Sequence, residues 1–448
     1  MDLSGKKVMV VGVAMSGIAS ARLLISKGAQ VVLYDAKTID EFDSGVFDEF
    51  EGIAQFALGA DAASIDVDAM VLSPGVPTAL PFIQKAIKEG KKVIGEQELG
   101  YMYTDADFVA ITGTNGKTTT TMLTGEIFIN AGISTHVLGN MGIPIAGEVD
   151  STKKGDVIVA ESAALQLETI DTFAPHVSAM LNITEDHLDR FGSMEKYIAA
   201  KKRVFENQTE CDFCVLNYDN EVSRSMEGLQ KSKIIWFSRK AELERGVFVK
   251  QGNIVCREDN RIFKVCDIEE ILIPGMHNLE NALAATAIAR CYDIPASIIA
   301  GTLREFKGVE HRIEFVREFE KVRYINDSKG TNPDATEKAA DAMTRPTVII
   351  LGGYDKKNSF TTLFNGFGEN IKAVVAIGAT TGNVVAGAKE AGFDNIYTAD
   401  TFKQAIETSK DIAQPGWNVL LSPACASYDM FKNFEQRGDV FKEIVNSF

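Results

Sequence analysis

Short apolar runs recur along this chain, and stretches with helical spacing lie between them. In the first part of the chain each run is followed by glycine, serine, proline or aspartate, which is typical of βα units. Strands that are buried on both faces of a parallel sheet read as continuous apolar runs. We therefore expect strands at residues 8–11, 31–34, 70–72, 93–94, 108–111, 156–160, 177–181, 213–216, 234–237, 347–351, 374–377 and 419–421.

The pattern changes between residues 246 and 267, where apolar and polar residues alternate. Such alternation favours antiparallel strands. The chain has 448 residues, which is too long for one hydrophobic core, so three domains are the natural expectation. The sequence thus predicts an α/β protein with domains at residues 1–97, 98–308 and 309–448.

The most informative segment is the loop Gly113-Thr114-Asn115-Gly116-Lys117-Thr118-Thr119-Thr120. It follows an expected strand and precedes a stretch with helical spacing, so it resembles a phosphate-binding loop. Glycines let backbone N–H groups converge on an anion, Lys117 can reach the outer phosphates, and the Thr118 hydroxyl can bind Mg²⁺. The spacing is shorter than G-x-x-x-x-G-K-[ST], because Ile111 stands where the first glycine would be. The alternative is an ordinary strand-to-helix turn with an exposed lysine.

A second glycine-containing turn, residues 12–17, follows the first expected strand and resembles a dinucleotide fingerprint with Ala14 at the second glycine. Asp35 ends the next strand, where an acid that binds ribose would lie. The loop 73–77 belongs to the same edge of the sheet. These features favour a nucleotide-type ligand such as a UDP group over NAD, and a purely structural tight turn is the alternative.

Other polar groups follow expected strands of the middle segment. Glu161 ends a strand and could complete a Mg²⁺ shell, or it could be a surface carboxylate. His187 lies in the acid-rich cluster 182–190, where it could bind a metal, orient a phosphate or be structural. Lys201 and Lys202 belong to a helix-forming stretch, for which a solvated basic face is the default interpretation.

Asn278 and Asn281 are three residues apart and therefore share one helix face, where two amides could read a purine edge or one could cap the helix. Arginines and lysines near the strands of the third segment could bind a carboxylate or a phosphate. They lie in the stretches 311–312, 326–329, 352–356 and 422–427.

The composition narrows the class of partner. With 46 basic and 62 acidic residues the net charge is −16, which argues against nucleic-acid binding. Among six cysteines only Cys211 and Cys214 form a C-x-x-C pair, so we expect reduced thiols rather than a zinc site or disulfides. No stretch approaches the roughly 20 apolar residues of a membrane helix. We expect a cytoplasmic protein without membrane insertion.

Taken in order, these motifs resemble the Mur ligase family over nearly the whole chain. The matching motifs are G-T-N-G-K-T-T-T at 113, the acid at 161, T-E-D-H at 184, A-A-K at 199, H-N-x-x-N at 277 and H-R at 311. The closing stretches 326–332 and 422–438 are similar to the members of that family that add D-glutamate. D-N-P-R, typical of the members that add diaminopimelate or lysine, does not occur.

The resemblance implies a Rossmann-like N-terminal domain, a central P-loop-type mononucleotide-binding domain and a Rossmann-like C-terminal domain. It implies an ATP-dependent ligase of peptidoglycan precursor synthesis that joins D-glutamate to UDP-MurNAc-L-Ala through an acyl phosphate and a tetrahedral intermediate. The expected partners are these small molecules, Mg²⁺ at two sites and no nucleic acid, and the expected state is a monomer.

The resemblance also implies roles for individual residues. The residues expected to be catalytic are Lys117, Glu161, His187 and Lys201. ATP would contact Gly113, Thr114, Asn115, Gly116, Lys117, Thr118, Thr119, Asn278, Asn281, Arg312 and Asp327. The UDP substrate would contact Met15, Ser16, Asp35, Gly75 and Asn140, and D-glutamate would contact Thr331, Lys356, Ser427 and Phe434.

The metal ligands implied by the resemblance are Thr118 and Glu161 for one Mg²⁺, and His187 and Lys201 for a second. An ammonium cannot bind a cation, so Lys201 would first have to be carbamylated by CO₂. The neighbouring Lys202 is the alternative.

The chain departs from the family pattern after Glu161, where Ala163 and Ala164 replace hydroxyl residues, and at Ala14. The nearest rivals are another ligase of the family, such as the one that adds L-alanine, and folylpolyglutamate synthase, against which Thr118 and Thr119 argue. An NAD-dependent dehydrogenase would have no use for Lys117. A GTPase-like switch would need no third domain.

Overall fold

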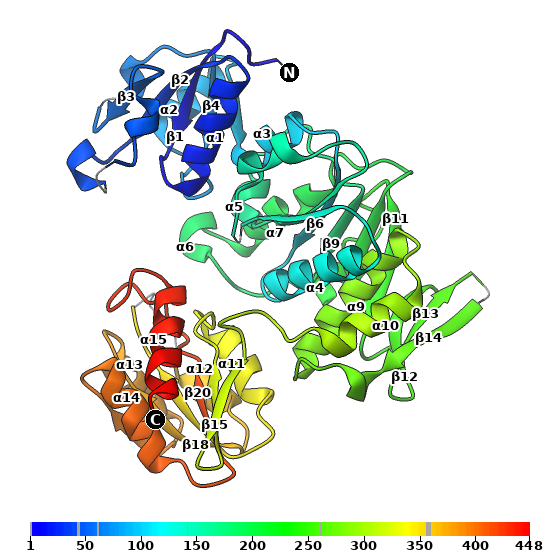
Figure 1. The fold of residues 1–448 in the computed structure, drawn as a ribbon, viewed down its shortest axis with the longest axis vertical. Coiled ribbons are helices and arrows are strands. Elements are labelled where there is room, and N and C mark those ends of the chain that lie inside the picture. Colours follow the sequence, from blue (N-terminus) through cyan, green and yellow to red (C-terminus); the bar gives the residue numbers. More distant parts are fainter. Residues whose placement is uncertain (1, 43–44, 61, 141, 260, 355–359) are drawn as a thin grey trace. The chain divides into compact units, whose positions relative to one another are not determined.

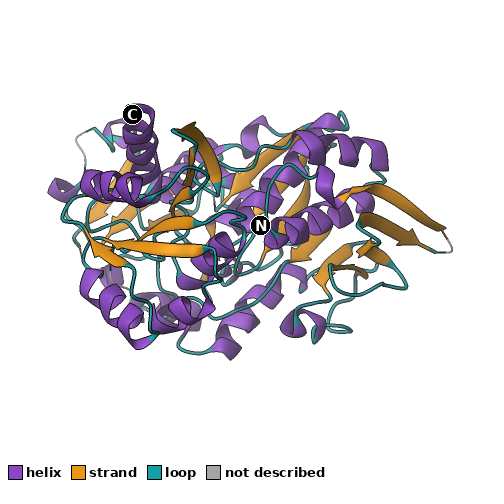
Figure 2. Cartoon of the chain, turned by 90° about the horizontal axis from the view of Figure 1, so that it is seen from below, coloured by secondary structure: helices purple, strands orange, loops and turns teal. Residues whose placement is uncertain are grey.

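Continuous apolar runs form the inner strands of three sheets. The computed structural model describes residues 2–42, 45–60, 62–140, 142–259, 261–354 and 360–448. They divide into one compact unit of residues 1–270 and 280–304 and a second of residues 271–279 and 305–448. Helices lie beside the strands of each sheet (Figures 1 and 2), so the predicted α/β class is confirmed.

The first unit contains two sheets, whose strands we give in spatial order. The first sheet is all parallel and runs β3 (Ala54–Leu58), β2 (Gln30–Asp35), β1 (Lys7–Val11), β4 (Ala69–Leu72) and β5 (Lys92–Gly95). The second runs β14 (Arg261–Asp267), β13 (Asn253–Glu258), β12 (Gly246–Lys250), β11 (Lys233–Ser238), β10 (Phe213–Asn217), β9 (Val177–Met180), β6 (Asp107–Thr112), β8 (Val157–Glu161) and β7 (Thr135–Gly139).

As the alternating pattern predicted, β12, β13 and β14 pair antiparallel, and the β13–β14 hairpin extends outward at the edge of its sheet (Figures 1 and 2). The helices of the first unit are α1 (Met15–Ser26), α2 (Pro81–Lys88), α3 (Glu96–Met102), α4 (Lys117–Asn130), α5 (Ala164–Leu167), α6 (Leu188–Phe191), α7 (Met194–Lys202), α8 (Glu221–Arg224) and α10 (Ala296–Glu305). Helix α9 (Met276–Cys291) begins in the second unit and continues in the first.

The second unit contains one sheet that is parallel except for its first strand pair. Its order is β15 (Glu314–Phe319), β16 (Val322–Asn326), β20 (Asn418–Leu421), β17 (Thr347–Leu351), β18 (Ile371–Ala376) and β19 (Ile396–Thr398). Its helices are α11 (Pro333–Asp341), α12 (Phe360–Gly366), α13 (Thr381–Glu390), α14 (Phe402–Ile412) and α15 (Phe434–Asn446).

Alternate residues of the inner strands enter cores on opposite faces of a sheet. In β1, Val8 and Val10 join a core with residues of α1, whereas Met9 and Val11 join a core with residues of α2. Strand β17 divides in the same way between α12 and α13 on one face and α14 and α15 on the other. Because both faces are covered, neither set of side chains needs to be polar.

The apolar pattern does not predict five of the strands, β3, β7, β15, β16 and β19. Four of these, all except β16, lie at an edge of their sheet. Edge strands are partly exposed, so their sequences carry a weaker apolar signal. Strand β16 has an exposed arginine, Arg323, between its apolar residues, which interrupts the run.

Two carboxylates of α3 tie the end of the first sheet to the second. Glu96 accepts a hydrogen bond from the backbone N–H of Ala146 at 2.7 Å, and its burial raises its pKa to about 7. Glu98 accepts from the three backbone N–H groups of residues 171–173 at 2.8–3.0 Å. Charge-assisted bonds of this kind are stronger than neutral ones, so α3 is an anchored connection.

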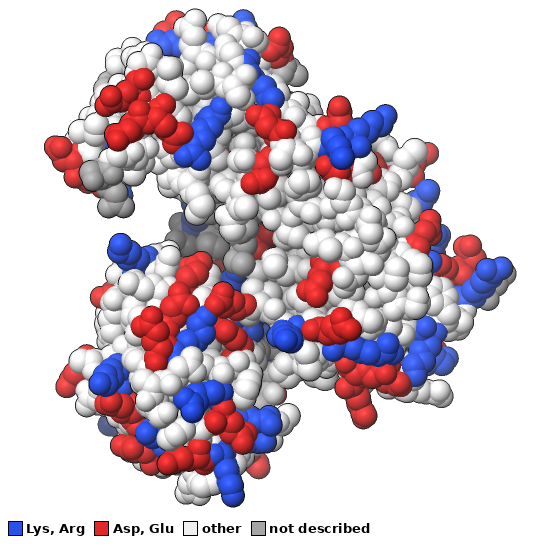
Figure 3. Space-filling view, viewed as in Figure 1, with Lys and Arg blue, Asp and Glu red and all other residues white. Residues whose placement is uncertain are grey.

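Acidic and basic side chains are interspersed on the face shown in Figure 3. Among the described residues, no helix is both long enough and apolar enough to cross a membrane.

Candidate functional site

The predicted phosphate-binding loop joins β6 to α4 at the carboxyl end of β6, between β8 and β9. Gly116 precedes the first helical residue and has φ of 87°, in the left-handed region that glycine adopts without strain. A side chain there would also run into the amide oxygen of Asn281. The first N–H groups of α4 thus point out of a glycine turn, as an anion site requires.

A neighbouring loop, residues 182–184, holds this turn in shape. The N–H of Thr114 donates to the carbonyl oxygen of Asn182 at 2.9 Å, and the N–H of Asn115 donates to the Asn182 side chain at 2.9 Å. The Thr114 hydroxyl donates to the carbonyl of Thr184 at 3.1 Å and lies 3.2 Å from the hydroxyl of Tyr197. The sequence indicates no such role for Asn182, because its partner lies 67 residues away.

Thr118, Glu161 and Asn140 form a connected polar group at the ends of β6, β7 and β8. The Thr118 hydroxyl donates to Oε2 of Glu161 at 2.8 Å, and the Asn140 amide donates to Oε1 at 3.0 Å. Glu161 is only 2% exposed. A hydroxyl beside a buried carboxylate is the oxygen-rich donor set that Mg²⁺ prefers, so these residues fit that ion.

Two lysines converge on the carbonyl oxygen of Gly113. Nζ of Lys117 lies 3.1 Å from it and also donates to the carbonyl of Thr114, while Nζ of Lys201 lies 2.7 Å from it. Lys201 is 1% exposed, and its Nζ stands 4.8 Å from the ring centre of Tyr197. Burial, reinforced by the positive charge of Lys117, lowers the pKa of Lys201 well below its usual value. The default interpretation of a solvated basic face is therefore wrong for Lys201.

His187 immediately precedes α6 and has φ of 51°, an uncommon backbone conformation for a residue other than glycine. Its side chain is half exposed, and its Nε2 lies 3.7 Å from Oδ2 of Asp186. The loop 182–184 that binds Thr114 runs directly into it. His187 can therefore offer a ring nitrogen to a metal or a substrate without being unpacked from the core.

The first sheet presents a turn built for close approach. Gly12 has φ of 85°, its carbonyl accepts from the Ser73 hydroxyl at 2.7 Å, and a side chain at Gly17 would run into the same carbonyl. Asp35 accepts from the N–H of Val13 at 3.0 Å. Ala14 adopts ordinary extended backbone in this turn, so the missing second glycine creates no strain.

The predicted residues around this turn are open to ligand. Met15 is 69% exposed, Gly75 is exposed and Ser16 is partly exposed. Asn140 belongs instead to the group around Glu161.

The two asparagines of α9 lie on one helix but belong to different units. Asn278 donates to the carbonyl of Pro274 at 2.7 Å within the second unit, whereas Asn281 accepts from the Thr120 hydroxyl at 3.3 Å within the first. Both are 4% exposed. Asn281 is thus connected to the helix that begins at the phosphate-binding loop.

The second unit places Asp327 at the end of β16, beside the end of β20. Asp327 accepts from the Ser422 hydroxyl at 2.6 Å and from the N–H of Ile313 at 3.2 Å. Its burial raises its pKa to about 6, although the charge of Arg312 works in the opposite direction. Arg312 and Asp327 are therefore electrostatically coupled.

Three of the four residues predicted for D-glutamate lie in the described chain. Ser427 is 2% exposed, and Thr331 and Phe434 are partly exposed. The ring of Phe434 lies 6.2 Å from that of His311, and Nζ of Lys329 stands 5.3 Å from its centre. Lys356 lies outside the described residues.

Arg437 is a buried residue of this region that the motif analysis missed. Its guanidinium donates to the carbonyl of Ser328 at 2.7 Å and to that of Cys425 at 3.1 Å. It therefore joins the loops that follow β16 and β20. The sequence shows only that an arginine is present in the stretch 422–438. That this arginine is 1% exposed is visible only in the fold.

Comparison with known proteins places the whole chain in one family. Three family models match it in order: "Mur ligase MurD-like, N-terminal domain" at residues 6–95, "Mur ligase middle domain" at 111–289 and "Mur ligase, glutamate ligase domain" at 311–425. The chain belongs to the Mur ligase family.

The sequence and structure relatives agree with this assignment. The UDP-N-acetylmuramoylalanine–D-glutamate ligase of Pelotomaculum thermopropionicum is 48% identical over 100% of this chain and 98% of its own length. The UDP-N-acetylmuramate–alanine ligase MurC of Thermotoga maritima superposes with a TM-score of 0.61 at 20% identity over 99% of both chains. A MurF ligase of Thermotoga maritima in complex with ADP has a TM-score of 0.60 at 16% identity, over 93% of this chain and 95% of that one.

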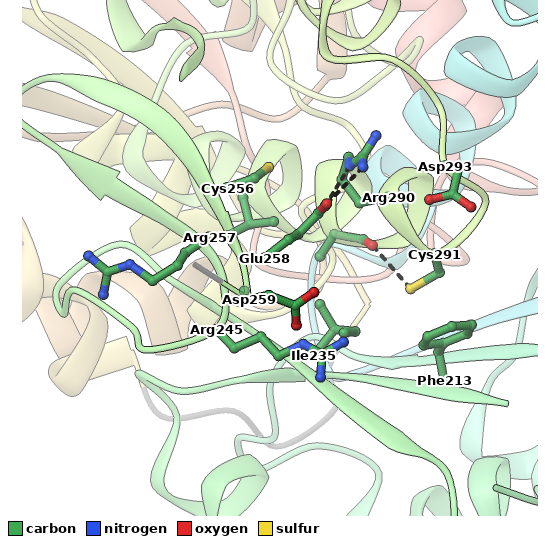
Figure 4. A pocket seen from close by; sticks show the side chains of 13 residues that line it. Phe213, Ile235, Arg245, Cys256, Arg257, Glu258, Asp259, Arg290, Cys291 and Asp293 are labelled. Carbon is green, nitrogen blue, oxygen red and sulfur yellow. Dashed lines mark hydrogen bonds and ion pairs between the residues drawn. The ribbon is translucent and has the colours of Figure 1, made fainter. Parts of the chain in front are cut away.

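A cavity of about 200 Å³ in this Mur ligase lies apart from the predicted residues, none of which lines it. Figure 4 shows Glu258 of β13 facing Arg290 of α9, with which it forms two hydrogen bonds of 2.7 and 2.9 Å. Cys291, also in this cavity, donates to the carbonyl of Ala287 at 3.2 Å. Glu258 and Arg290 thus bind each other, and Cys291 binds the backbone.

The raised pKa of Asp327 predicts how the stability of the fold depends on pH. Its folded pKa of about 6 exceeds the ordinary 3.8, so its protonated form stabilises the fold below about pH 4, and this contribution is lost as the pH rises through about 6. Asp327→Asn removes the buried charge, at a gain of at most about 3 kcal/mol at neutral pH. The melting temperature of the variant minus that of the wild type should increase between about pH 4 and pH 8.

Thermal unfolding of the full chain at about pH 4 and pH 8 measures this difference in melting temperature. The matched control is Asp411→Asn, which replaces an exposed carboxylate of α14 and removes no buried charge. A difference for Asp327→Asn that is equal at both pH values would contradict the raised pKa.

Proposed function

We propose that this Mur ligase joins D-glutamate to UDP-N-acetylmuramoyl-L-alanine with hydrolysis of ATP to ADP and phosphate. The observation that carries the proposal is the 48% identity, over the full chain, to a relative named for this reaction. The described site supports it, because the phosphate-binding loop has the N–H groups, the lysine and the hydroxyl that a triphosphate requires.

The reaction must bring two anions together. The alanyl carboxylate attacks the γ-phosphorus of ATP, forming an acyl phosphate and releasing ADP. The amine of D-glutamate then adds to the carbonyl carbon, and the tetrahedral intermediate expels phosphate. Lys117, whose ammonium lies at the turn before α4, would offset the repulsion between the carboxylate and the γ-phosphate.

Thr118 and Glu161 would hold one Mg²⁺, and His187 with a modified Lys201 would hold the second. The ions would supply Lewis-acid stabilisation of the phosphoryl oxygens. Asn278, Asn281, Arg312 and Asp327 would contact ATP. Met15, Ser16, Asp35, Gly75 and Asn140 would contact the sugar nucleotide, and Thr331, Lys356, Ser427 and Phe434 would contact D-glutamate.

The site fits a carbamate at Lys201 better than an ammonium. Burial lowers the pKa of Lys201 and so favours its neutral amine, which is the form that can attack CO₂. The new N–C bond and the loss of one proton leave an anionic carbamate, whose oxygens are suitable Mg²⁺ ligands. We assign the modification to Lys201 rather than to the less buried Lys202.

The first experiment tests the acceptor and the amino acid. Phosphate release should require ATP, UDP-N-acetylmuramoyl-L-alanine and D-glutamate together, because the acyl phosphate needs both the carboxylate and an amine. L-glutamate, D-alanine, L-lysine and meso-diaminopimelate serve as controls. Release with one of these and none with D-glutamate would refute the assignment.

Lys117→Ala should lower kcat by about 10³-fold, the size expected when one preorganised charge at a reacting phosphate is lost. Its melting temperature should match that of the wild type. Lys88→Ala, an exposed lysine on α2, is the control and should keep full turnover. Turnover of Lys117→Ala close to that of the control would disprove the role in phosphate binding.

Carbamylation of Lys201 should be visible as the mass of one CO₂ in native mass spectra of the intact chain, and as a carbamate signal in NMR after exchange with isotope-labelled bicarbonate. Activity should fall in CO₂-free buffer and return with bicarbonate. Lys202→Ala should retain the signal and Lys201→Ala should lose it. An active enzyme with unmodified Lys201 would overturn this part of the proposal.

A further inference from the structure

Glu168 lies at the end of α5 and binds two segments that approach it from different sheets. Its Oε1 accepts from the hydroxyl of Thr78 at 2.7 Å, in the loop that follows β4. Its Oε2 accepts from the guanidinium of Arg190 at 2.8 Å, in α6. Each carboxylate oxygen therefore has its own donor, and both donors belong to the first unit.

The backbone of Glu168 is itself anchored. Arg203 donates to the carbonyls of Leu167, Glu168 and Ile170 at 3.1, 2.6 and 2.7 Å. These bonds satisfy carbonyls at the end of α5 that have no partner within the helix. The backbone of Glu168 is thus held in place, and its side chain positions Thr78 and Arg190.

Helix α6 has few other restraints. It contains only residues 188–191, Leu188 is 37% exposed, and its apolar anchor is Phe191, whose ring lies 5.5 Å from that of Tyr197. A cavity of about 440 Å³, lined by Thr78, Glu168, Arg190 and Lys196 among others, adjoins it. The Arg190 side of α6 therefore borders open space, and the bond from Arg190 to Glu168 restrains it there.

The backbone of His187 depends on this helix. Its carbonyl accepts from the N–H groups of Arg190 and Phe191, both at 3.0 Å. A residue other than glycine keeps a left-handed conformation only where its surroundings determine it. Because the same Arg190 is bound by Glu168, the position of His187 is linked through Glu168 to Thr78.

The loop that carries Thr78 also carries Gly75. The N–H of Val76 donates to the carbonyl of Ser73 at 3.0 Å, and the Gln84 side chain donates to the carbonyl of Thr78 at 2.9 Å. The first bond closes the turn around Gly75, and the second ties Thr78 to α2. Gly75 and Thr78 thus lie three residues apart in a loop that is bonded on both sides of them.

We propose that Glu168 is a positioning residue that couples the sugar-nucleotide loop, residues 73–80, to His187 through Arg190. Binding of the sugar nucleotide at this loop then reinforces the restraint that Arg190 places on the backbone of His187, so the proposed second metal site is better ordered when the acceptor is bound. This inference rests on the proposed roles of Gly75 and His187.

The test compares Glu168→Ala and Thr78→Val with Glu258→Gln. Glu258 is the matched control, because it also binds an arginine through its carboxylate but lines the separate cavity of Figure 4. Hydrogen exchange of the full chain, read by mass spectrometry, gives a measurement that does not depend on activity. Without ligand, Glu168→Ala should accelerate exchange in residues 186–192, and Thr78→Val and Glu258→Gln should not.

UDP-N-acetylmuramoyl-L-alanine should protect both residues 73–80 and residues 186–192 in the wild type. In Thr78→Val it should protect residues 73–80 alone. In steady-state assays Glu168→Ala should lower kcat/KM for this substrate about tenfold, the lower limit of the activity lost with a group that orients a metal ligand, and leave the KM for ATP nearly unchanged. Glu258→Gln should behave as the wild type.

Unchanged exchange of residues 186–192 in Glu168→Ala would overturn the proposal. If that variant exchanges faster throughout the first unit, Thr78→Val decides: protection of residues 186–192 by the sugar nucleotide in this variant refutes the coupling, and its loss supports it. Absence of phosphate release by the wild type would refute the proposed function instead, and the ligand-free comparison would still test the positioning by Glu168.

Discussion

Two lysine side chains share one backbone carbonyl, and the chemistry of the central site depends on that arrangement. Lys117 and Lys201 both donate to the oxygen of Gly113, where two ammonium charges would repel each other in a medium of low dielectric. Lys201 is the buried member of the pair, and its pKa is lowered by burial and by the charge of Lys117. A lowered pKa favours the neutral amine, so Lys201 differs in its chemistry from an ordinary surface lysine.

Parallel strands bring the rest of the site to these lysines. Strand β6 lies between β8 and β9, so Thr118, Glu161 and the loop before His187 follow three neighbouring strand ends. The second unit repeats the principle with β16, β20 and β17, whose ends carry Asp327, Ser422 and Gly352. Residues far apart in the sequence thus meet because the carboxyl ends of parallel strands share one edge.

The sequence predicts those parts that depend on local pattern. Inner strands are recognisable because both faces are apolar, and the phosphate-binding loop because its glycine, lysine and hydroxyl are adjacent in the chain. Partners across the fold leave no local trace: Asn182 beside Asn115, and Arg437 beside Cys425, are recognised only from their contacts. The burial of Lys201 is likewise a tertiary property, and a basic helix stretch gives no sign of it.

The boundary between the two units falls within α9, which limits how the chain can be divided into fragments. The second unit consists of residues 271–279 and 305–448, and the segment between them, residues 280–304, belongs to the first unit. Gly275 lies so close to His277 and to Ala342 that a side chain at Gly275 would strike both. A fragment that starts at residue 305 therefore lacks a segment of its own unit, and one that starts at 271 also contains residues 280–304 of the first unit. No single break in the backbone yields two self-sufficient pieces.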